Sequence, residues 1–289
     1  MAFAYPMQKL QDWFTQQWVI LRGQKINPED FSWLMGPFGI LEAVGEDYIR
    51  KFAAKEGLIM EKGGAHTGLI PEMVKLNLSD ADFKRLSKEV IHFYEQTAAY
   101  NLDFALRWNP LFKACGILLN KLFSNRINQL NVPTRNLKDS ELLNSELITL
   151  SDPVTKAVKY TFWYRSIQST GKVIYSGVYG TCVLPSGETC VKAVFPLPNG
   201  NATVLMSPKV DQDGALILDS IGKRFGDAGF YFLLKDAKGR YWSQFIRSFR
   251  DRLVLTAAPG HIAAQQTLTL WHKKVLRFNY TIKLKAQCS

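Results

Sequence analysis

Cysteine, glycine-rich phosphate motifs and long apolar runs are all scarce or absent in this 289-residue chain. The four cysteines are too few and too scattered for a disulfide scaffold, and none forms the C-x-x-C pair of metal and redox sites. The chain also lacks G-x-G-x-x-G, G-x-x-x-x-G-K-[ST] and G-x-S-x-G. These absences argue against nucleotide cofactors and serine hydrolases, so we expect no cofactor and no metal.

No stretch of about 18 uncharged apolar residues is present, as a membrane-spanning helix would need. The nearest candidate, residues 114–120, is bracketed by Lys113 and Lys121. Lys9 and Asp12 interrupt the segment that would form the core of a signal peptide. We therefore expect a cytoplasmic location, with peripheral attachment to a membrane as the alternative.

Acidic residues are scarce in the second half of the chain. Residues 1–150 contain 17 Lys and Arg and 17 Asp and Glu, whereas residues 151–289 contain 19 and 8. The net charge of +11 therefore belongs to the second half. This asymmetry favours an anionic partner, such as nucleic acid, a membrane surface or an acidic small molecule, although a well-hydrated soluble surface explains it equally well.

Residues 1–144 have the apolar spacing of helices, and we expect a helical region there. Apolar side chains recur at helical spacing over 10–21. A second helix is expected to begin at Pro28, to be interrupted at Gly36-Pro37 and to end at Gly57. Two further helices are expected over 79–97 and 109–127.

Residues 145–289 consist of short β-branched and aromatic runs separated by turn signals, which predicts about eight to ten strands. So many consecutive strands require an antiparallel sheet that curls or closes. Along the last run, Phe278, Tyr280, Ile282 and Leu284 should point inward and the basic residues outward. The expected fold is α+β, a helical N-terminal region packed on a curved antiparallel β-barrel or half-barrel.

Cys182 and Cys190 are the cysteines that local pairing can bring together. They flank Pro185-Ser186-Gly187, and a three-residue loop pairing Leu184 with Glu188 would place them directly opposite each other. We expect both to be reduced thiols.

Four segments carry a resemblance to a family of uncharacterised bacterial proteins: 93–95 (FYE), 130–133 (LNVP), 194–202 (VFPLPNGNA) and 224–231 (RFGDAGFY). The resemblance covers most of the chain. The second half also resembles a bacterial domain of unknown function that is sometimes attached to dehydrogenase-like proteins. Neither resemblance implies an activity, so neither supplies catalytic residues.

Two loops contain candidate ligand-binding residues. Asn199 and Asn201 have side-chain amides that would suit a polar ligand at a barrel mouth, although Pro-Asn-Gly-Asn is also typical of a tight turn. Arg224 would bind a carboxylate or phosphate, with Asp227 orienting it and Tyr231 contacting the body of the ligand. The alternative is an ion pair between Arg224 and Asp227 that fixes the loop.

Candidate acid or base groups are Tyr94, Glu95, Asp103 and His272. The first three are near one another in sequence, but carboxylates on polar helix faces are usually only solvated. His272 has the strand parity of Leu268 and Leu270, which would direct it inward. A histidine in that position is more often a hydrogen-bonded core residue than a general base.

Basic and aromatic residues alternate over 240–252, a pattern that could stack single-stranded nucleic acid. We consider nucleic acid an unlikely partner because no recognised nucleic-acid-binding signature accompanies it. The same cations, with the apolar helices after Lys9 and Pro110, suit an anionic membrane surface better.

The leading functional hypothesis is that the sheet encloses a pocket for an apolar or amphiphilic small molecule or lipid, with the helices as a lid or support. The first alternative is a cofactor-independent enzyme of the cyclase or isomerase type acting on such a molecule. The second is a peripheral interaction protein that docks on an anionic membrane or polymer.

Overall fold

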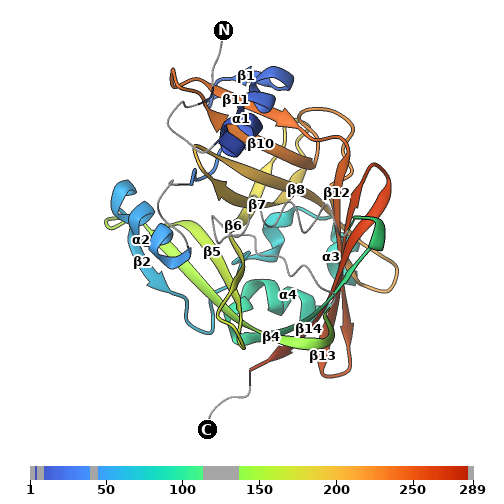
Figure 1. Ribbon diagram of the computed structural model, residues 1–289. Coiled ribbons are helices and arrows are strands. Elements are labelled where there is room, and N and C mark those ends of the chain that lie inside the picture. Colours follow the sequence, from blue (N-terminus) through green and yellow to red (C-terminus); the bar gives the residue numbers. More distant parts are fainter. Residues whose placement is uncertain (1–3, 5–9, 40–44, 113–136, 286–289) are drawn as a thin grey trace.

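The computed structural model describes residue 4 and residues 10–39, 45–112 and 137–285 (Figure 1). Its helices are α1 (Leu10–Arg22), α2 (Gly45–Glu56), η1 (Met73–Leu76), α3 (Asp80–Arg85), α4 (Lys88–Glu95) and η2 (Thr97–Ala99). Its strands are β1 (Gln24–Ile26), β2 (Ile59–Lys62), β3 (Tyr100–Trp108), β4 (Leu137–Ser151), β5 (Val158–Ile167), β6 (Val173–Val183), β7 (Thr189–Leu197), β8 (Gly200–Val210), β9 (Leu216–Asp219), β10 (Gly229–Lys235), β11 (Tyr241–Phe245), β12 (Phe249–Ala258), β13 (His261–Leu270) and β14 (Lys273–Leu284).

Ten of the strands in the described part of the chain form a closed antiparallel barrel. Neighbouring strands follow the order β8-β7-β6-β5-β4-β3-β14-β13-β12-β9, and β9 pairs again with β8 to close the ring. Because β9 pairs with both β8 and β12, neither end of this strand order is a free sheet edge, and backbone hydrogen bonds continue around the ring. The expected α+β barrel is confirmed.

The sheet divides at β8. Gly200–Leu205 of this strand pairs with β10, whereas Ser207–Val210 pairs with β9. From β10 the sheet continues outward through β11 to β1. Figure 1 shows this extension, with α1 against it, at the top of the molecule. The extension explains how one sheet supplies both the barrel wall and a platform for the N-terminal helix.

A helical segment fills part of the barrel interior. In Figure 1 the short helix α4 lies within the ring of strands, and α3, which has no buried residue, precedes it in the chain. Their apolar side chains and those of η1 join the inward side chains of the barrel in one core, with Met73, Leu86, Val90 and Phe93 all buried. The helices therefore support the barrel from inside.

Separate apolar layers cover part of the barrel's outer face. Tyr48 and Phe52 of α2 pack on Phe162 and Val178, which point outward from β5 and β6. Another layer, formed by the segment between β1 and α2, packs on β7, β8 and β10. Several strands are consequently apolar on both faces, and their sequences lack a simple alternation.

Three of the four helix predictions can be tested, and one is wrong. Helices are present at 10–22 and 45–56, the second of them ending at Gly57, whose φ is +65°. Residues 28–34 form successive turns in place of a helix, with the amide of Leu34 donating to Phe31 O. The helix expected over 79–97 begins at the Ser79 cap as predicted, but it divides where Ser87 caps α4.

The fourth expected helix, 109–127, has a helical turn at 110–112, and the rest of this range lies outside the described residues. The expected division at residue 145 does not coincide with the start of the barrel. All of β3 and the first part of β4 lie within residues 1–144, so that region also contributes strands.

The predicted register of the Cys182–Cys190 hairpin is confirmed. Leu184 N donates to Glu188 O at 2.8 Å, and the two cysteines are directly paired across β6 and β7. Both are free thiols. On β14, Phe278, Tyr280 and Ile282 point inward as predicted, whereas Leu284 at the end of the strand is exposed. In the described residues, no helix combines the length and the hydropathy needed to cross a membrane.

Candidate ligand-binding cavity

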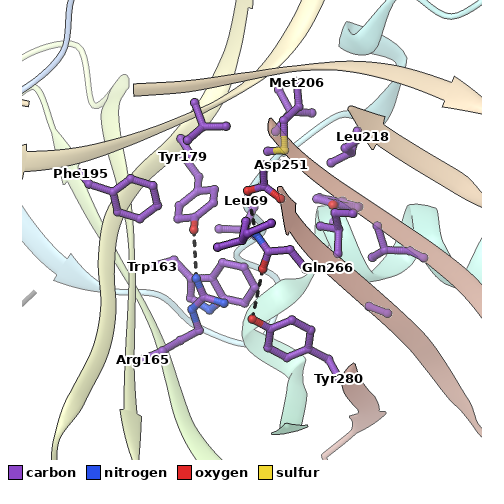
Figure 2. A pocket seen from close by; sticks show the side chains of 18 of the residues that line it. Leu69, Trp163, Arg165, Tyr179, Phe195, Met206, Leu218, Asp251, Gln266 and Tyr280 are labelled. Carbon is purple, nitrogen blue, oxygen red and sulfur yellow. Dashed lines mark hydrogen bonds between the residues drawn. The ribbon is translucent and has the colours of Figure 1, made fainter. Parts of the chain in front are cut away.

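A cavity of about 220 Å³ lies inside the barrel, between the inward faces of the strands and α4 (Figure 2). Most of the side chains around it are apolar, including Leu69, Phe93, Val191, Ala193, Phe195, Ala202, Val204, Met206, Leu218, Phe230, Phe249, Leu253, Leu255, Ala264, Leu268 and Ile282. The polar lining is limited to a few residues on β5, β6, β12, β13 and β14, together with Tyr94 of α4. Apolar walls with a few convergent polar groups are typical of small-molecule sites.

Arg165 is the one Lys or Arg among the described residues that line the cavity. Its side chain extends inward from β5 and is buried, with the guanidinium carbon 3.8 Å from the centre of the Trp163 ring. Arg165 Nη2 donates to the Tyr179 hydroxyl at 3.0 Å. The aromatic face and the phenol together help to hold the guanidinium in place.

Tyr179 and Tyr280 lie beside this guanidinium. Burial raises the pKa of both phenols above the ordinary value of 10.0, although Arg165 acts in the opposite direction on each. Both tyrosines are therefore neutral at physiological pH, and the Tyr179 hydroxyl, which accepts from Arg165, keeps a proton to donate.

Asp251, on β12, is the carboxylate of the described cavity lining. Its Oδ2 accepts from Gln266 Nε2 at 2.7 Å, and Gln266 Oε1 accepts from the Tyr280 hydroxyl at 3.3 Å. Asp251 Oδ1 is buried and has no hydrogen-bond partner among the described residues. One oxygen of a nearly inaccessible carboxyl group is thus left for a ligand.

The pKa of Asp251 is raised from 3.8 to about 7. Burial is the main cause, the hydrogen bond from Gln266 opposes it, and the nearby charge of Asp219 adds to it. The carboxyl group consequently exchanges its proton close to neutral pH, as suits a proton acceptor or a pH-sensitive binding group. The described residues contain no cluster of three or more His, Cys, Asp or Glu side chains that could hold a metal ion.

The chain is similar to an uncharacterised membrane protein of Bacillus subtilis. This relative, YndJ, is 24% identical over 189 residues, which are 65% of this chain and 33% of the relative. The chain therefore spans about a third of the length of the curated relative that it matches. The match agrees with the expected resemblance to uncharacterised bacterial proteins. No family model matches the chain. No solved structure matches it either.

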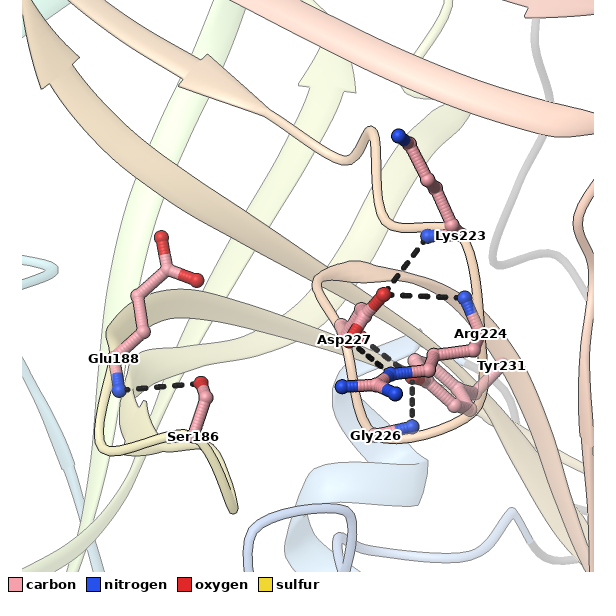
Figure 3. A network of polar contacts seen from close by, with 7 residues as sticks. All are labelled: Ser186, Glu188, Lys223, Arg224, Gly226, Asp227 and Tyr231. Atoms are coloured by element: carbon pink, nitrogen blue, oxygen red, sulfur yellow. Dashed lines mark hydrogen bonds and ion pairs between the residues drawn. The ribbon is translucent and has the colours of Figure 1, made fainter.

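Three of the predicted ligand-binding residues come together outside the cavity lining, Arg224 and Asp227 in one loop and Tyr231 on β10 beside it (Figure 3). Asp227 Oδ2 accepts from the amides of Lys223 and Arg224 at 2.9 and 3.1 Å. The Arg224 side chain is 85% exposed, with Nε 3.7 Å from Asp227 Oδ1. Tyr231 donates to Asp227 O and accepts from Gly226 N, so its hydroxyl is used within the loop. This geometry favours the loop-fixing alternative.

The other two predicted ligand-binding residues also lie away from the cavity. Asn199 has a φ of +55° in the turn between β7 and β8, the conformation that its turn interpretation requires. Asn201 is buried on the outer side of β8, where its Nδ2 donates to Gly36 O and Pro37 O at 3.3 and 3.4 Å. Its amide therefore joins the N-terminal segment to the barrel.

Of the predicted acid or base residues, Tyr94 is the one that lines the cavity. Burial raises the pKa of its phenol. The neighbouring Glu95 points to a different partner, since its Oε1 accepts from Met73 N at 2.8 Å. Asp103 lies on β3, paired with Thr281 of β14, and is outside the cavity lining.

The expectation that His272 points inward is wrong. The residue lies in the exposed turn between β13 and β14, with a φ of +64°. The strand ends at Leu270, so the alternation that would have directed the histidine inward does not extend to it.

Phe249 also differs from its expected place on a nucleic-acid-stacking surface, because its ring lines the cavity and lies 4.7 Å from that of Phe230.

Five polar residues of the cavity were not among the predicted site residues: Arg165, Tyr179, Asp251, Gln266 and Tyr280. The alternation of the last strand already predicts an inward Tyr280, and a signal for two others is also present in the sequence. Asp251 has the strand parity of Phe249, Leu253 and Leu255, and Gln266 has that of Ile262, Ala264 and Leu268. A polar residue within an otherwise apolar strand face is an informative exception.

Proposed function

We propose that the barrel binds a small, mostly apolar molecule that carries one polar group. The observation behind this proposal is the joint presence of a cavity of about 220 Å³, apolar walls and the polar group of Arg165, Tyr179, Tyr280, Gln266 and Asp251. A core that served stability alone would be filled with apolar side chains at high packing density.

The volume limits the size of the molecule. A dry apolar cavity of roughly 150 Å³ holds benzene, which has about six heavy atoms. By proportion, a cavity of about 220 Å³ holds a molecule of about nine heavy atoms. The proposed ligand is therefore of the size of a substituted benzene or a short-chain alcohol, and longer lipids would not fit without a change in the barrel.

Two adjacent alanines on β13 provide a matched test. Ala264 is buried and lines the cavity, whereas Ala263 is exposed on the outer face. We expect benzyl alcohol to bind the wild-type protein and Ala263→Phe in calorimetric titrations, and to bind Ala264→Phe at least tenfold more weakly. Ala193→Leu, a smaller obstruction on β7, should have an intermediate effect. Equal affinity in Ala264→Phe and Ala263→Phe, both shown to be folded by circular dichroism, would refute the proposal.

Cofactor-independent acid–base catalysis on such a molecule is a second candidate. It is favoured by the position of Asp251, whose partially titrating carboxyl group faces the same cavity as the neutral phenols of Tyr179 and Tyr280. A carboxyl group with a pKa near the working pH is suited to move a proton between two positions of one substrate. Loss of turnover in Asp251→Asn with ligand affinity retained would support this candidate, and unchanged turnover would refute it.

Peripheral contact with a membrane is a third candidate. The Bacillus subtilis relative is named a membrane protein. On α1, Phe14, Trp18 and Leu21 are 59%, 43% and 73% exposed and follow one another at helical spacing. Exposed aromatic and aliphatic side chains on an amphipathic helix suit the interfacial region of a bilayer.

Flotation with anionic phosphatidylglycerol vesicles tests the membrane candidate. We expect the wild-type protein to float with the vesicles at low salt and the variant Phe14→Ser, Trp18→Ser, Leu21→Ser to remain in solution. Raising the salt concentration should weaken the wild-type interaction, because screening reduces attraction between basic side chains and anionic lipid. Equal flotation of the two proteins would count against α1 as the contact.

A further inference from the structure

We propose that the polar end of the cavity binds the carboxylate group of a small monocarboxylic acid through Arg165 and Tyr179, beside Tyr280, and that Asp251 takes up a proton when the anion enters. This inference rests on the proposed binding function and adds the chemical class of the ligand. It concerns residues that lie on four different strands, β5, β6, β12 and β14, and converge on one cavity.

The first step is the choice of donors. The guanidinium of Arg165 carries a fixed positive charge and several N–H groups in one plane, the arrangement that best matches a carboxylate. Tyr179 accepts a hydrogen bond from Arg165, so its own hydroxyl proton can be donated to a ligand oxygen. Tyr280 is a neutral phenol next to the same guanidinium, and its hydroxyl proton is donated to Gln266 Oε1, so it lines the site without serving as a ligand donor. These groups favour a ligand that accepts hydrogen bonds and carries negative charge.

The second step concerns where Asp251 carries its proton. Oδ2 already accepts from Gln266, which leaves the unpartnered Oδ1 as the oxygen to be protonated. A protonated Oδ1 is a further donor facing the cavity, whereas an ionised carboxylate there would repel an anion. Binding of a carboxylate and protonation of Asp251 therefore favour each other, as linked equilibria must.

The third step is the balance of charge around Asp251. Asp219 of β9 adds negative potential, and Arg165 provides the positive charge in the described cavity lining. Tyr94, Tyr179 and Tyr280 face the same space as neutral phenols. Arg250 and Arg252 are neighbours of Asp251 on β12 but point to the opposite face of the strand, where Arg252 pairs with Asp219.

With Asp251 protonated, the charged groups of the described lining amount to the single positive charge of Arg165, which matches a monoanion. With Asp251 ionised, the charges of Arg165 and Asp251 cancel, and the described lining does not favour an anionic ligand over a neutral one. A dianionic phosphate would exceed the positive charge available in either state. The charge balance therefore favours a monocarboxylic acid over a phosphate.

Benzoate and benzamide form a matched pair of probes. They have the same shape and about nine heavy atoms, the number that the cavity volume admits, and they differ in charge. Benzoate is ionised throughout pH 6–8, since carboxyl groups ionise near pH ~4. We expect benzoate to bind the wild-type protein at pH 6 at least tenfold more tightly than benzamide. Because the pKa of Asp251 is about 7, benzoate affinity should fall about tenfold from pH 6 to pH 8, and benzamide affinity should not.

Two variants separate the roles of the charged groups. Arg165→Gln should weaken benzoate binding by about ten- to a hundredfold and leave benzamide binding within about threefold, which also shows that the cavity is intact. Asp251→Asn should bind benzoate at pH 8 as tightly as at pH 6. Arg277→Gln and Asp213→Asn, which change charges outside the cavity lining, should behave as the wild type.

The outcomes distinguish this inference from the proposed function. If benzamide and benzyl alcohol bind but benzoate binds no more tightly than benzamide at pH 6, the carboxylate assignment is overturned and the binding function stands. If the pH dependence persists in Asp251→Asn, proton uptake by Asp251 is overturned. If none of the three probes binds, the proposed function itself fails.

Discussion

Replacing Asp251 by Asn should stabilise the protein at alkaline pH and do much less at acidic pH. The carboxyl group has a pKa of about 7 in the folded protein and 3.8 as its ordinary value. In the unfolded chain it therefore releases its proton at a pH about three units lower than in the folded protein. A raised carboxyl pKa means that stability is greatest below the unfolded value and is lost as pH rises toward the folded value.

The magnitude follows from the two pKa values. Each unit of difference corresponds to about 1.4 kcal/mol, so ionisation of Asp251 costs about 4 kcal/mol of folding free energy above pH 7. Most of this cost develops between pH 5 and pH 8, where it grows by about 3 kcal/mol. Asn has the shape of the protonated carboxyl group, keeps an acceptor for Gln266 and does not ionise.

The assay is urea denaturation of both proteins at pH 5, 6, 7 and 8, with the free energy of unfolding obtained by linear extrapolation. The gain in stability from Asp251→Asn should be about 3 kcal/mol larger at pH 8 than at pH 5. Titrating groups that do not interact with Asp251 cancel in the difference between the two proteins. Asp213→Asn, on an exposed turn, is the control and should show no such change between the two pH values. A gain that is the same at pH 5 and pH 8 would refute the reasoning.

Three further substitutions test the fold around the barrel, all by urea denaturation. Asp236→Ala removes a buried acceptor of four hydrogen bonds and should cost about 2 to 4 kcal/mol, whereas a loss below about 1 kcal/mol would contradict that role. Gly36→Ala places a Cβ 2.8 Å from Val194 Cγ1 and should cost about 1 to 3 kcal/mol, while Gly64→Ala, which meets nothing within 4 Å, serves as its control. Asn201→Ala removes the amide that joins the N-terminal segment to β8 and should cost about 1 to 3 kcal/mol; a neutral result would show that water replaces it.

The barrel could be predicted because turn signals are local and because most neighbouring strands of the sheet are also consecutive in the sequence. The hairpin of Cys182 and Cys190 is an example, since the three-residue loop alone determines which residues pair. The closing contact could not be predicted in the same way. It depends on β8 pairing with β9 along one half of its length and with β10 along the other, and no local signal specifies such a division.

The helix expected from Pro28 shows the limit of capping signals. Asn27-Pro28-Glu29-Asp30 has the composition of a helix start, but Trp33 and Leu34 are buried in the layer that covers the outside of the barrel. A series of turns places both side chains against β10 and its neighbours. Tertiary packing therefore outweighs the local preference.

The inward position of Arg165 could not be predicted, because β5 is covered on both faces. Trp163 and Arg165 point into the barrel, while Phe162 and Tyr164 point outward toward α2. Aromatic residues thus occur at both parities, and the sequence does not reveal which face is the interior. Strand β12 has no such ambiguity, and the inward position of Asp251 could have been inferred from Phe249 and Leu253.

Asp251 also helps to decide between a structural and a functional role for the polar cluster. An Asn at this position would keep the hydrogen bond with Gln266 and avoid the ionisation cost of about 4 kcal/mol at neutral pH. A buried group that lowers stability without improving packing is characteristic of a site selected for its chemistry. If Asp251→Asn is more stable than the wild type at pH 8 and at the same time loses the pH dependence of benzoate binding, the carboxyl group serves the ligand at the expense of the fold. If the variant is less stable at every pH, the carboxyl group is part of the structural framework, and the cavity has to be explained without it.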